Sequence, residues 1–82
     1  MAQETVIYYA IVDAFSSRRR PAGVLRRTWR DGERRDEAFG RNLAWGHATA
    51  RYPPGSPELH EISEDEANRI VARMLRAAAC QD

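Results

Sequence analysis

The stretch VLRRTWRDGERRDEAF, residues 24–39, decides the fold of this chain. Two runs of extended-type sequence flank Asp31-Gly32, which is a preferred dipeptide for a two-residue type I′ hairpin turn. A loop of two residues fixes the register, because facing residues must then have numbers that sum to 63. The sequence therefore predicts an antiparallel hairpin that turns at Asp31 and Gly32.

This register places opposite charges face to face. The three pairs are Arg26 with Glu37, Arg27 with Asp36 and Arg30 with Glu33. Trp29 faces Arg34, which favours a cation–π contact. Each cross-strand pair contributes about 0.2 to 1 kcal/mol, so the pairs act mainly to fix the register.

The segments around the hairpin predict an α+β domain. Residues 5–13 are typical of a core strand that is apolar on both faces, and residues 59–62 of a short edge strand. Residues 16–21 and 53–57 are predicted loops, whereas residues 41–52 show no clean period and are expected to be irregular. We expect a small antiparallel sheet of three to four strands, in the order β-β-β-(β)-α, with one C-terminal amphipathic helix packed on one face.

The C-terminal helix is predicted to begin after Ser63. Ser63 is a typical N-cap residue, and Glu66 follows three positions later as in a capping box. Apolar residues at spacings of three and four form one side of this helix: Ala67, Ile70, Val71, Met74, Leu75 and Ala78. The pattern predicts that one side of the helix packs on one face of the sheet.

Length and composition limit the class of protein. The chain has 82 residues, enough for one hydrophobic core, so we expect residues 1–82 to form a single domain of marginal stability. Its one cysteine, Cys80, excludes an intrachain disulfide. Because the sequence has neither a signal-peptide pattern nor an apolar run of about 20 residues, we expect a cytoplasmic protein that does not bind a membrane.

The sequence carries no recognisable catalytic, metal-binding or phosphate-binding motif. His47 and His60 are too few for a ligand set, and Cys80 has no CxxC motif around it. Asp13 ends an apolar run and fits either a buried acid or the first residue of a turn. We therefore expect no enzymatic activity, no catalytic residue, no metal and no cofactor.

Arginine is the main chemical feature of the chain. All 13 basic residues are arginines, as in proteins from high-GC genomes, and residues 1–51 have a net charge of +4 against −3 for residues 52–82. The two halves either attract each other or offer a basic face to an acidic partner. Some arginines have no carboxylate partner in the predicted hairpin. Four of these are candidates for binding nucleic acid: Arg18, Arg19, Arg20 and Arg35. Nucleic-acid binding is the alternative function, and ordinary solvated surface is the competing interpretation.

Large aromatic side chains are candidates for a protein interface, because they contribute most of the energy at protein contacts. The predicted partner-binding residues are Tyr8, Tyr9, Trp29 and Trp45, together with Arg34. One helix covers only one face of a sheet, so a strand that is apolar on both faces needs a second cover. We therefore expect a non-enzymatic protein-interaction module that forms a homo-oligomer or docks on a protein partner. The competing interpretation is that the aromatic residues fill the small core.

Several segments spread over the chain carry a resemblance to known proteins. They are YYA at residues 8–10, GVLRR at 23–27, DEAFGRNLAW at 36–45, EIS at 61–63 and EA at 66–67. In these segments the chain resembles small uncharacterised proteins of high-GC actinobacteria. The resemblance implies that the whole chain is one unit, and it assigns no activity and no functional residue.

Overall fold

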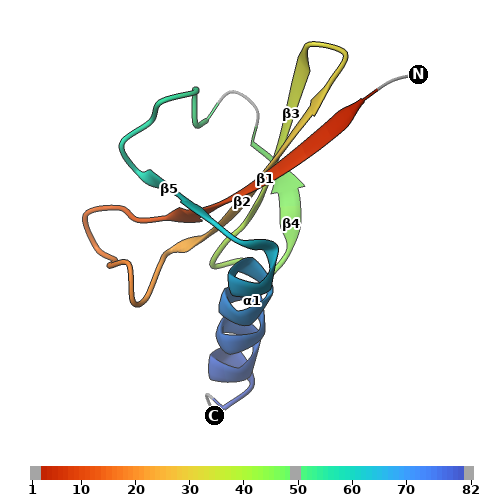
Figure 1. Cartoon of the computed structure of the whole chain (residues 1–82). Helices are drawn as coiled ribbons and strands as arrows, with labels where there is room; N and C mark the ends of the chain where they lie inside the picture. Colours follow the sequence, from red (N-terminus) through yellow and green to blue (C-terminus); the bar gives the residue numbers. More distant parts are fainter. Residues whose placement is uncertain (1–2, 49–50, 81–82) are drawn as a thin grey trace.

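The computed structural model describes residues 3–48 and 51–80. Within these ranges it contains five strands and one helix (Figure 1). The strands are β1 (Glu4–Ile11), β2 (Gly23–Arg30), β3 (Glu33–Phe39), β4 (Trp45–His47) and β5 (Leu59–Ile62), and the helix is α1 (Glu64–Ala79). The arrangement is α+β, as the sequence predicts.

The strands form one antiparallel sheet in the order β4-β3-β2-β1-β5. The sequence predicts at most four strands, of which β5 is the fourth, so the sheet has one strand more than predicted. The additional strand is β4, which lies inside residues 41–52, where the sequence predicts irregular structure. Three residues are too few to show an alternating pattern, so pairing with β3 defines this strand and periodicity does not.

The hairpin between β2 and β3 confirms the predicted register. All seven facing pairs, from Val24 with Phe39 to Arg30 with Glu33, have the predicted partners. Asp31 and Gly32 have φ angles of 52° and 80°, and the positive φ at both residues is that of a type I′ turn.

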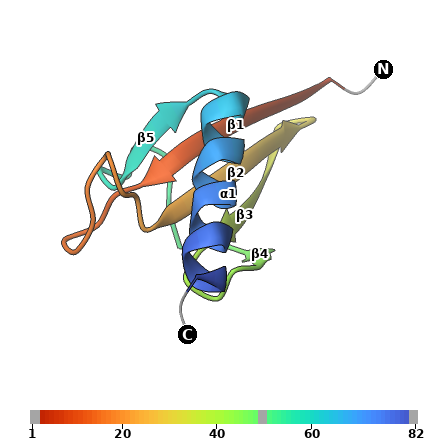
Figure 2. The ribbon, with the colours of Figure 1, turned by 90° about the horizontal axis from the view of Figure 1, so that it is seen from below.

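Helix α1 crosses one face of the sheet over β1 and β2 (Figure 2), and its packing there centres on Ala10 and Val24. Its first turn has the predicted cap, because Ser63 Oγ accepts a hydrogen bond from the Glu66 N–H at 3.1 Å. The buried residues of this layer are Ala10, Val24, Ala67 and Ile70. The apolar side of the helix therefore packs as predicted, on a small patch around Ala10 and Val24.

The opposite face of the same half of the sheet is covered by the chain itself. Ile11, Leu25 and Ala48 are buried there, and Tyr52 from the segment between β4 and β5 and Leu59 at the start of β5 pack against them. The expectation that a second molecule must cover this face is therefore wrong for this half of the sheet. A connection without regular structure makes the second cover, and a periodic pattern cannot indicate such a layer.

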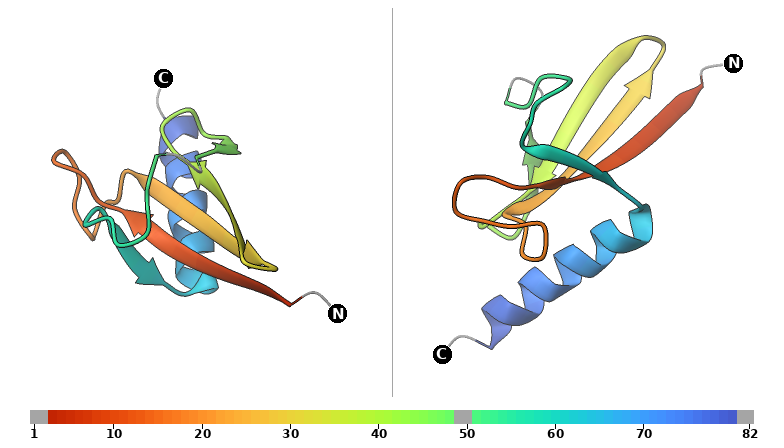
Figure 3. Two further views of the ribbon diagram at one scale, coloured as in Figure 1. Left: turned by 90° about the horizontal axis from the view of Figure 1, so that it is seen from above. Right: turned by 60° about the vertical axis from the view of Figure 1, so that its left-hand side comes forward.

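The other half of the sheet extends past both covers, and we call it the distal arm. It consists of residues 4–7 of β1, 28–30 of β2 and 33–35 of β3, with the hairpin turn at its tip. None of these residues is buried. Figure 3 shows that α1 runs away from the hairpin turn, which leaves the arm projecting from a molecule with extents of 48 × 25 × 20 Å. In the part of the chain that the structure describes, no helix has the length and apolarity needed to cross a membrane.

Candidate interaction surfaces

A buried ion pair fastens the covered half of the sheet to the segment that crosses it. The Nε and Nη2 atoms of Arg27 donate hydrogen bonds of 2.9 Å to Oδ1 and Oδ2 of Asp36, and the two side chains are 3% and 0% exposed. Arg27 Nη2 also donates to the Tyr52 carbonyl oxygen, and the guanidinium lies over the Tyr9 ring at 5.4 Å from its centroid. The hydrogen bonds to Asp36 raise the pKa of Arg27.

This pair explains how the irregular cover is held in place. The Asp36 carbonyl oxygen accepts a hydrogen bond of 3.0 Å from the Ala48 N–H. The Asp36 side chain holds Arg27, which in turn donates to the Tyr52 carbonyl oxygen, so Asp36 anchors the segment after β4 both directly and through Arg27. No buried side-chain polar atom in the described ranges lacks a hydrogen-bond partner. Arg27 and Asp36 therefore have a structural role, in which satisfied hydrogen bonds balance the cost of burying charge.

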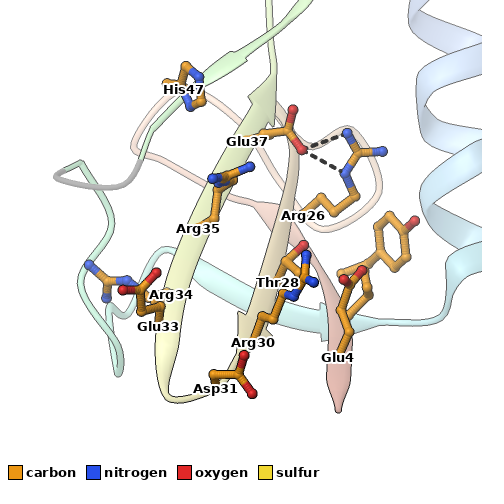
Figure 4. A pocket seen from close by; sticks show the side chains of 12 residues that line it. Glu4, Arg26, Thr28, Arg30, Asp31, Glu33, Arg34, Arg35, Glu37 and His47 are labelled. Carbon is orange, nitrogen blue, oxygen red and sulfur yellow. Dashed lines mark hydrogen bonds and ion pairs between the residues drawn. The ribbon is translucent and has the colours of Figure 1, made fainter. Parts of the chain in front are cut away.

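A groove of about 1040 Å³ lies on the α1 side of the distal arm, between the start of the helix and the hairpin tip. Val6, Tyr8 and Thr28 are among the residues that line it, and Figure 4 shows Thr28 on β2. Eight charged residues line it: Glu4, Asp31, Glu33, Glu37, Arg26, Arg30, Arg34 and Arg35. Both signs of charge are present in equal number, so the groove is polar without being strongly acidic or basic.

The groove is ordered at the end closest to α1. Arg26 donates to Glu37 through Nη2 at 2.8 Å (Figure 4). The guanidinium of Arg26 lies 4.5 Å from the centroid of the Trp45 ring. The bond to Glu37 raises the pKa of Arg26. The Tyr8 hydroxyl donates to Glu64 at the first turn of α1 at 3.3 Å. The contacts of Arg26 join β2 to β3 and β4, and the hydrogen bond of Tyr8 joins the sheet to the helix.

Toward the hairpin tip, the facing charges do not all form the ion pairs that the sequence predicts. Arg30 faces Glu33 in the ladder, but within the described ranges neither residue forms an ion pair. Arg34 faces Trp29, and its Nε lies 3.7 Å from Asp36 Oδ2. The predicted cation–π contact of Trp29 with Arg34 stays a prediction. Arg30 and Glu33 are therefore less engaged within the chain than Arg26 and Glu37.

The backbone of β1 has an open edge along the arm. β5 pairs only with Tyr8–Ile11, and no described residue pairs with Glu4–Ile7 on that side. The Val12 N–H bonds to the Glu58 carbonyl oxygen, whereas the Ile11 carbonyl oxygen bonds to the Ala22 N–H at the β2 side. Backbone groups alternate in direction along an antiparallel strand, so the even-numbered residues of β1 point away from β2. Glu4 and Val6 therefore present their N–H and C=O groups to the open edge.

The end of the sheet opposite the arm carries the loop of residues 12–22. Asp13 organises it: Oδ1 accepts hydrogen bonds of 2.9 Å from the Phe15 N–H and from the Ser16 hydroxyl. The Ser16 hydroxyl bond, then the Phe15 N–H, and also the nearby charge of Arg41 lower the pKa of Asp13. Of the two interpretations of Asp13, the turn is confirmed.

This loop displays an unusual combination of side chains. Phe15 is 89% exposed, and Arg18, Arg19 and Arg20 are exposed as well. A recess of about 430 Å³ lies beside the loop, on the side of the sheet opposite α1. Its lining includes Asp13 and Ala22 from the two ends of the loop, and also Arg41, Asn42, His47, Arg51 and Tyr52.

The structure separates the residues that the sequence predicted as one site. Tyr8 and Trp45 lie on the α1 side of the sheet, whereas Tyr9, Trp29 and Arg34 lie on the other face, since facing residues share a face and neighbours alternate. Among the candidate nucleic-acid-binding residues, Arg18, Arg19 and Arg20 lie in the loop that leads into β2. Arg35 lies on the distal arm near the other end of β2.

Sequence reasoning missed three residues that the structure brings forward. Glu4 and Val6 form the open edge. Within the described ranges they are unpaired on that side because β5 ends opposite Tyr8, and no local sequence pattern shows where β5 ends. Phe15 had a usable signal, because it is a large apolar residue next to a polar, arginine-rich loop.

Comparison with known proteins adds no further assignment. No protein-family model, curated protein or solved structure matches this chain. In the ranges that the structure describes, no group of three or more His, Cys, Asp or Glu residues is arranged to hold a metal ion.

Proposed function

We propose that this chain is a small non-enzymatic protein-interaction module that self-associates through the open edge of β1. One observation carries the proposal: β5 ends opposite Tyr8, so Glu4 and Val6 direct their backbone groups to a side that no described strand occupies. Such an edge is a template for pairing with another chain. The exposed side chain of Val6, at 42%, lies beside it.

A second copy fits this edge by symmetry. A two-fold axis perpendicular to the sheet pairs two β1 strands antiparallel and keeps both α1 helices on the same side. Residues that face each other must then share a side of the sheet. With Thr5 on the axis, Glu4 of each copy faces Val6 of the other, and each such pair exchanges both backbone hydrogen bonds. If the axis lay closer to the C-terminal end of β1, the second copy of β1 would occupy the position of β5.

The charge of the groove supports a protein as the occupant. Four arginines and four carboxylates line the groove next to the open edge. A polyanion would be repelled by half of these charges, whereas a protein surface offers both signs and can complement them. A strand from a different protein is the related alternative for the same edge. A cytoplasmic location is part of the proposal, supported by Cys80, an exposed free thiol in a chain with one cysteine.

Light scattering after size-exclusion chromatography, over the micromolar concentration range, tests the proposal. We expect the mass of a dimer. Val6→Pro removes the outward N–H of β1, leaves the hydrogen bonds to β2 in place and should give a monomer. Val6→Ala keeps that N–H and is the matched control, so it should retain most of the dimer.

Two results would contradict the proposed edge. One is a monomeric mass at every concentration, with no partner recovered in a pull-down. The other is a dimer that Val6→Pro leaves intact. If the chain instead forms a complex with a different protein and Val6→Pro disrupts that complex, the open edge is still the binding site, but its occupant is that protein and not a second copy.

A further inference from the structure

We propose that the end of the sheet opposite the distal arm binds single-stranded nucleic acid. The site consists of the loop of residues 12–22 and the recess beside it, and we call it the loop end. It lies at the start of β2, whereas the open edge of β1 lies beside the end of that strand. The inference is therefore independent of the proposed self-association.

The loop end carries five arginines that lie outside the ion pairs of the described residues. The arginines of this region are Arg18, Arg19, Arg20, Arg41 and Arg51, and none forms an ion pair with a residue in the ranges 3–48 and 51–80. The neighbouring carboxylates are Asp13 and Glu58. Asp13 is already engaged by Ser16 and the Phe15 N–H. Arginines that are not held in ion pairs can contact a phosphodiester backbone.

An exposed aromatic ring, Phe15, lies in the same loop as Arg18, Arg19 and Arg20. The hydrogen bond from the Phe15 N–H to Asp13 fixes the backbone of the turn, and the side chain stays 89% exposed. A base can stack on a ring whose faces are open to solvent, whatever the sequence of the strand. Phe15 thus supplies the second element that a single-strand site needs besides charge.

The recess beside the loop gives the strand a place to lie. Its volume of about 430 Å³ falls in the range of about 300 to 1,000 Å³ that is typical of small-molecule pockets, so a nucleobase can enter it. Arg51 lies over the Tyr52 ring there, 5.9 Å from the centroid, which presents a guanidinium next to an aromatic surface. Asn42 and His47 line the same recess.

These features favour a single strand over the other anionic partners. A duplex keeps its base faces stacked and offers nothing to Phe15. Stable attachment to a membrane needs a wider apolar surface than one ring, together with charge. An acidic peptide would engage the arginines but would leave the open ring of Phe15 unused.

Fluorescence anisotropy with labelled single-stranded DNA and RNA of mixed sequence, and with a duplex of the same length, tests the inference. We expect the single strands to bind more tightly than the duplex. Phe15→Ala should weaken binding about tenfold and leave the salt dependence unchanged. The triple variant Arg18→Gln, Arg19→Gln, Arg20→Gln should reduce the slope of log affinity against log salt by about 2, since each phosphate contact of a single strand contributes about 0.7.

A matched control removes charge from the far side of the molecule. The double variant Arg69→Gln, Arg73→Gln on the exposed side of α1 should leave binding unchanged. Val6→Pro should also leave it unchanged, because Val6 lies on the distal arm. Circular dichroism verifies that each variant is folded.

Three outcomes would overturn the inference. The first is the absence of binding to either single strand at low salt. The second is affinity that Phe15→Ala does not reduce, or that the α1 double variant reduces as much as the loop variant does. The third is binding to anionic phosphatidylserine vesicles or to polyglutamate in preference to the oligonucleotides.

Discussion

The two halves of β2 have different surroundings although they belong to one strand. In the covered half, Val24 is buried under α1 and Leu25 under the segment that follows β4. In the distal arm, Thr28 and Trp29 are half-buried and Arg30 is exposed. The backbone ladder to β3 continues without interruption through both halves.

The difference indicates that the covered half of the sheet stabilises the fold, whereas the distal arm is available for binding. Hydrogen bonds of the ladder alone contribute little net stability, because water competes for the same groups, so burial on both faces stabilises the covered half. The arm has the same ladder without the covers. Its side chains and its open edge are therefore available to another molecule, and substitutions in the two halves should have different effects.

The largest contrast should come from the buried ion pair. Asp36→Ala leaves the Arg27 guanidinium buried without a counter-charge and releases the segment that covers Leu25, so we expect a loss of about 3 to 5 kcal/mol of unfolding free energy. Urea denaturation followed by circular dichroism measures it. Glu33→Ala on the arm should cost less than about 0.5 kcal/mol, because Glu33 is exposed. Equal losses for the two variants would contradict the contrast.

The next contrast compares two apolar residues on the same side of the same strand. Leu25 is 0% exposed and Trp29 is half-buried on the arm. Leu25→Ala should cost about 2 to 5 kcal/mol through lost burial and a cavity. Trp29→Ala should cost about 1 kcal/mol or less, which is close to the loss at surface positions. Measuring both in the Val6→Pro background removes any contribution from self-association, and a larger loss for Trp29→Ala would contradict the division into two halves.

The elements confirmed from sequence alone are those specified by neighbouring residues. Asp31-Gly32 fixes the hairpin, and opposite charges on its strands agree with the register that the turn imposes. Ser63 and Glu66 mark the start of α1 in the same local way. In each case a turn or a cap uses residues within a few positions of one another, so the physical cause is visible in the sequence.

What the sequence could not specify depends on distant contacts. Whether β1 is covered or open at a given residue depends on where β5 stops and on how Tyr52 and Ala48 reach the sheet. Arg27 and Arg30 have equivalent predicted partners, yet Arg27 is buried with Asp36 whereas Arg30 is exposed on the arm. The hairpin turn specifies which residues face each other. Whether such a pair is buried, and therefore how much it contributes to stability, depends on a segment more than 20 residues away.

The smallest contrast compares two facing charge pairs. Arg26 and Glu37 are joined at 2.8 Å with side chains 32% and 33% exposed, whereas Arg30 and Glu33 form no ion pair within the described ranges. Double-mutant cycles with glutamine at each position should give a coupling of about 0.5 kcal/mol for the first pair and no measurable coupling for the second. The first coupling should fall as salt is added, because partly exposed charges are screened. A coupling of the same size at Arg30 and Glu33 would mean that the arm is ordered by its own charges, and the covers would then not explain why the two halves differ.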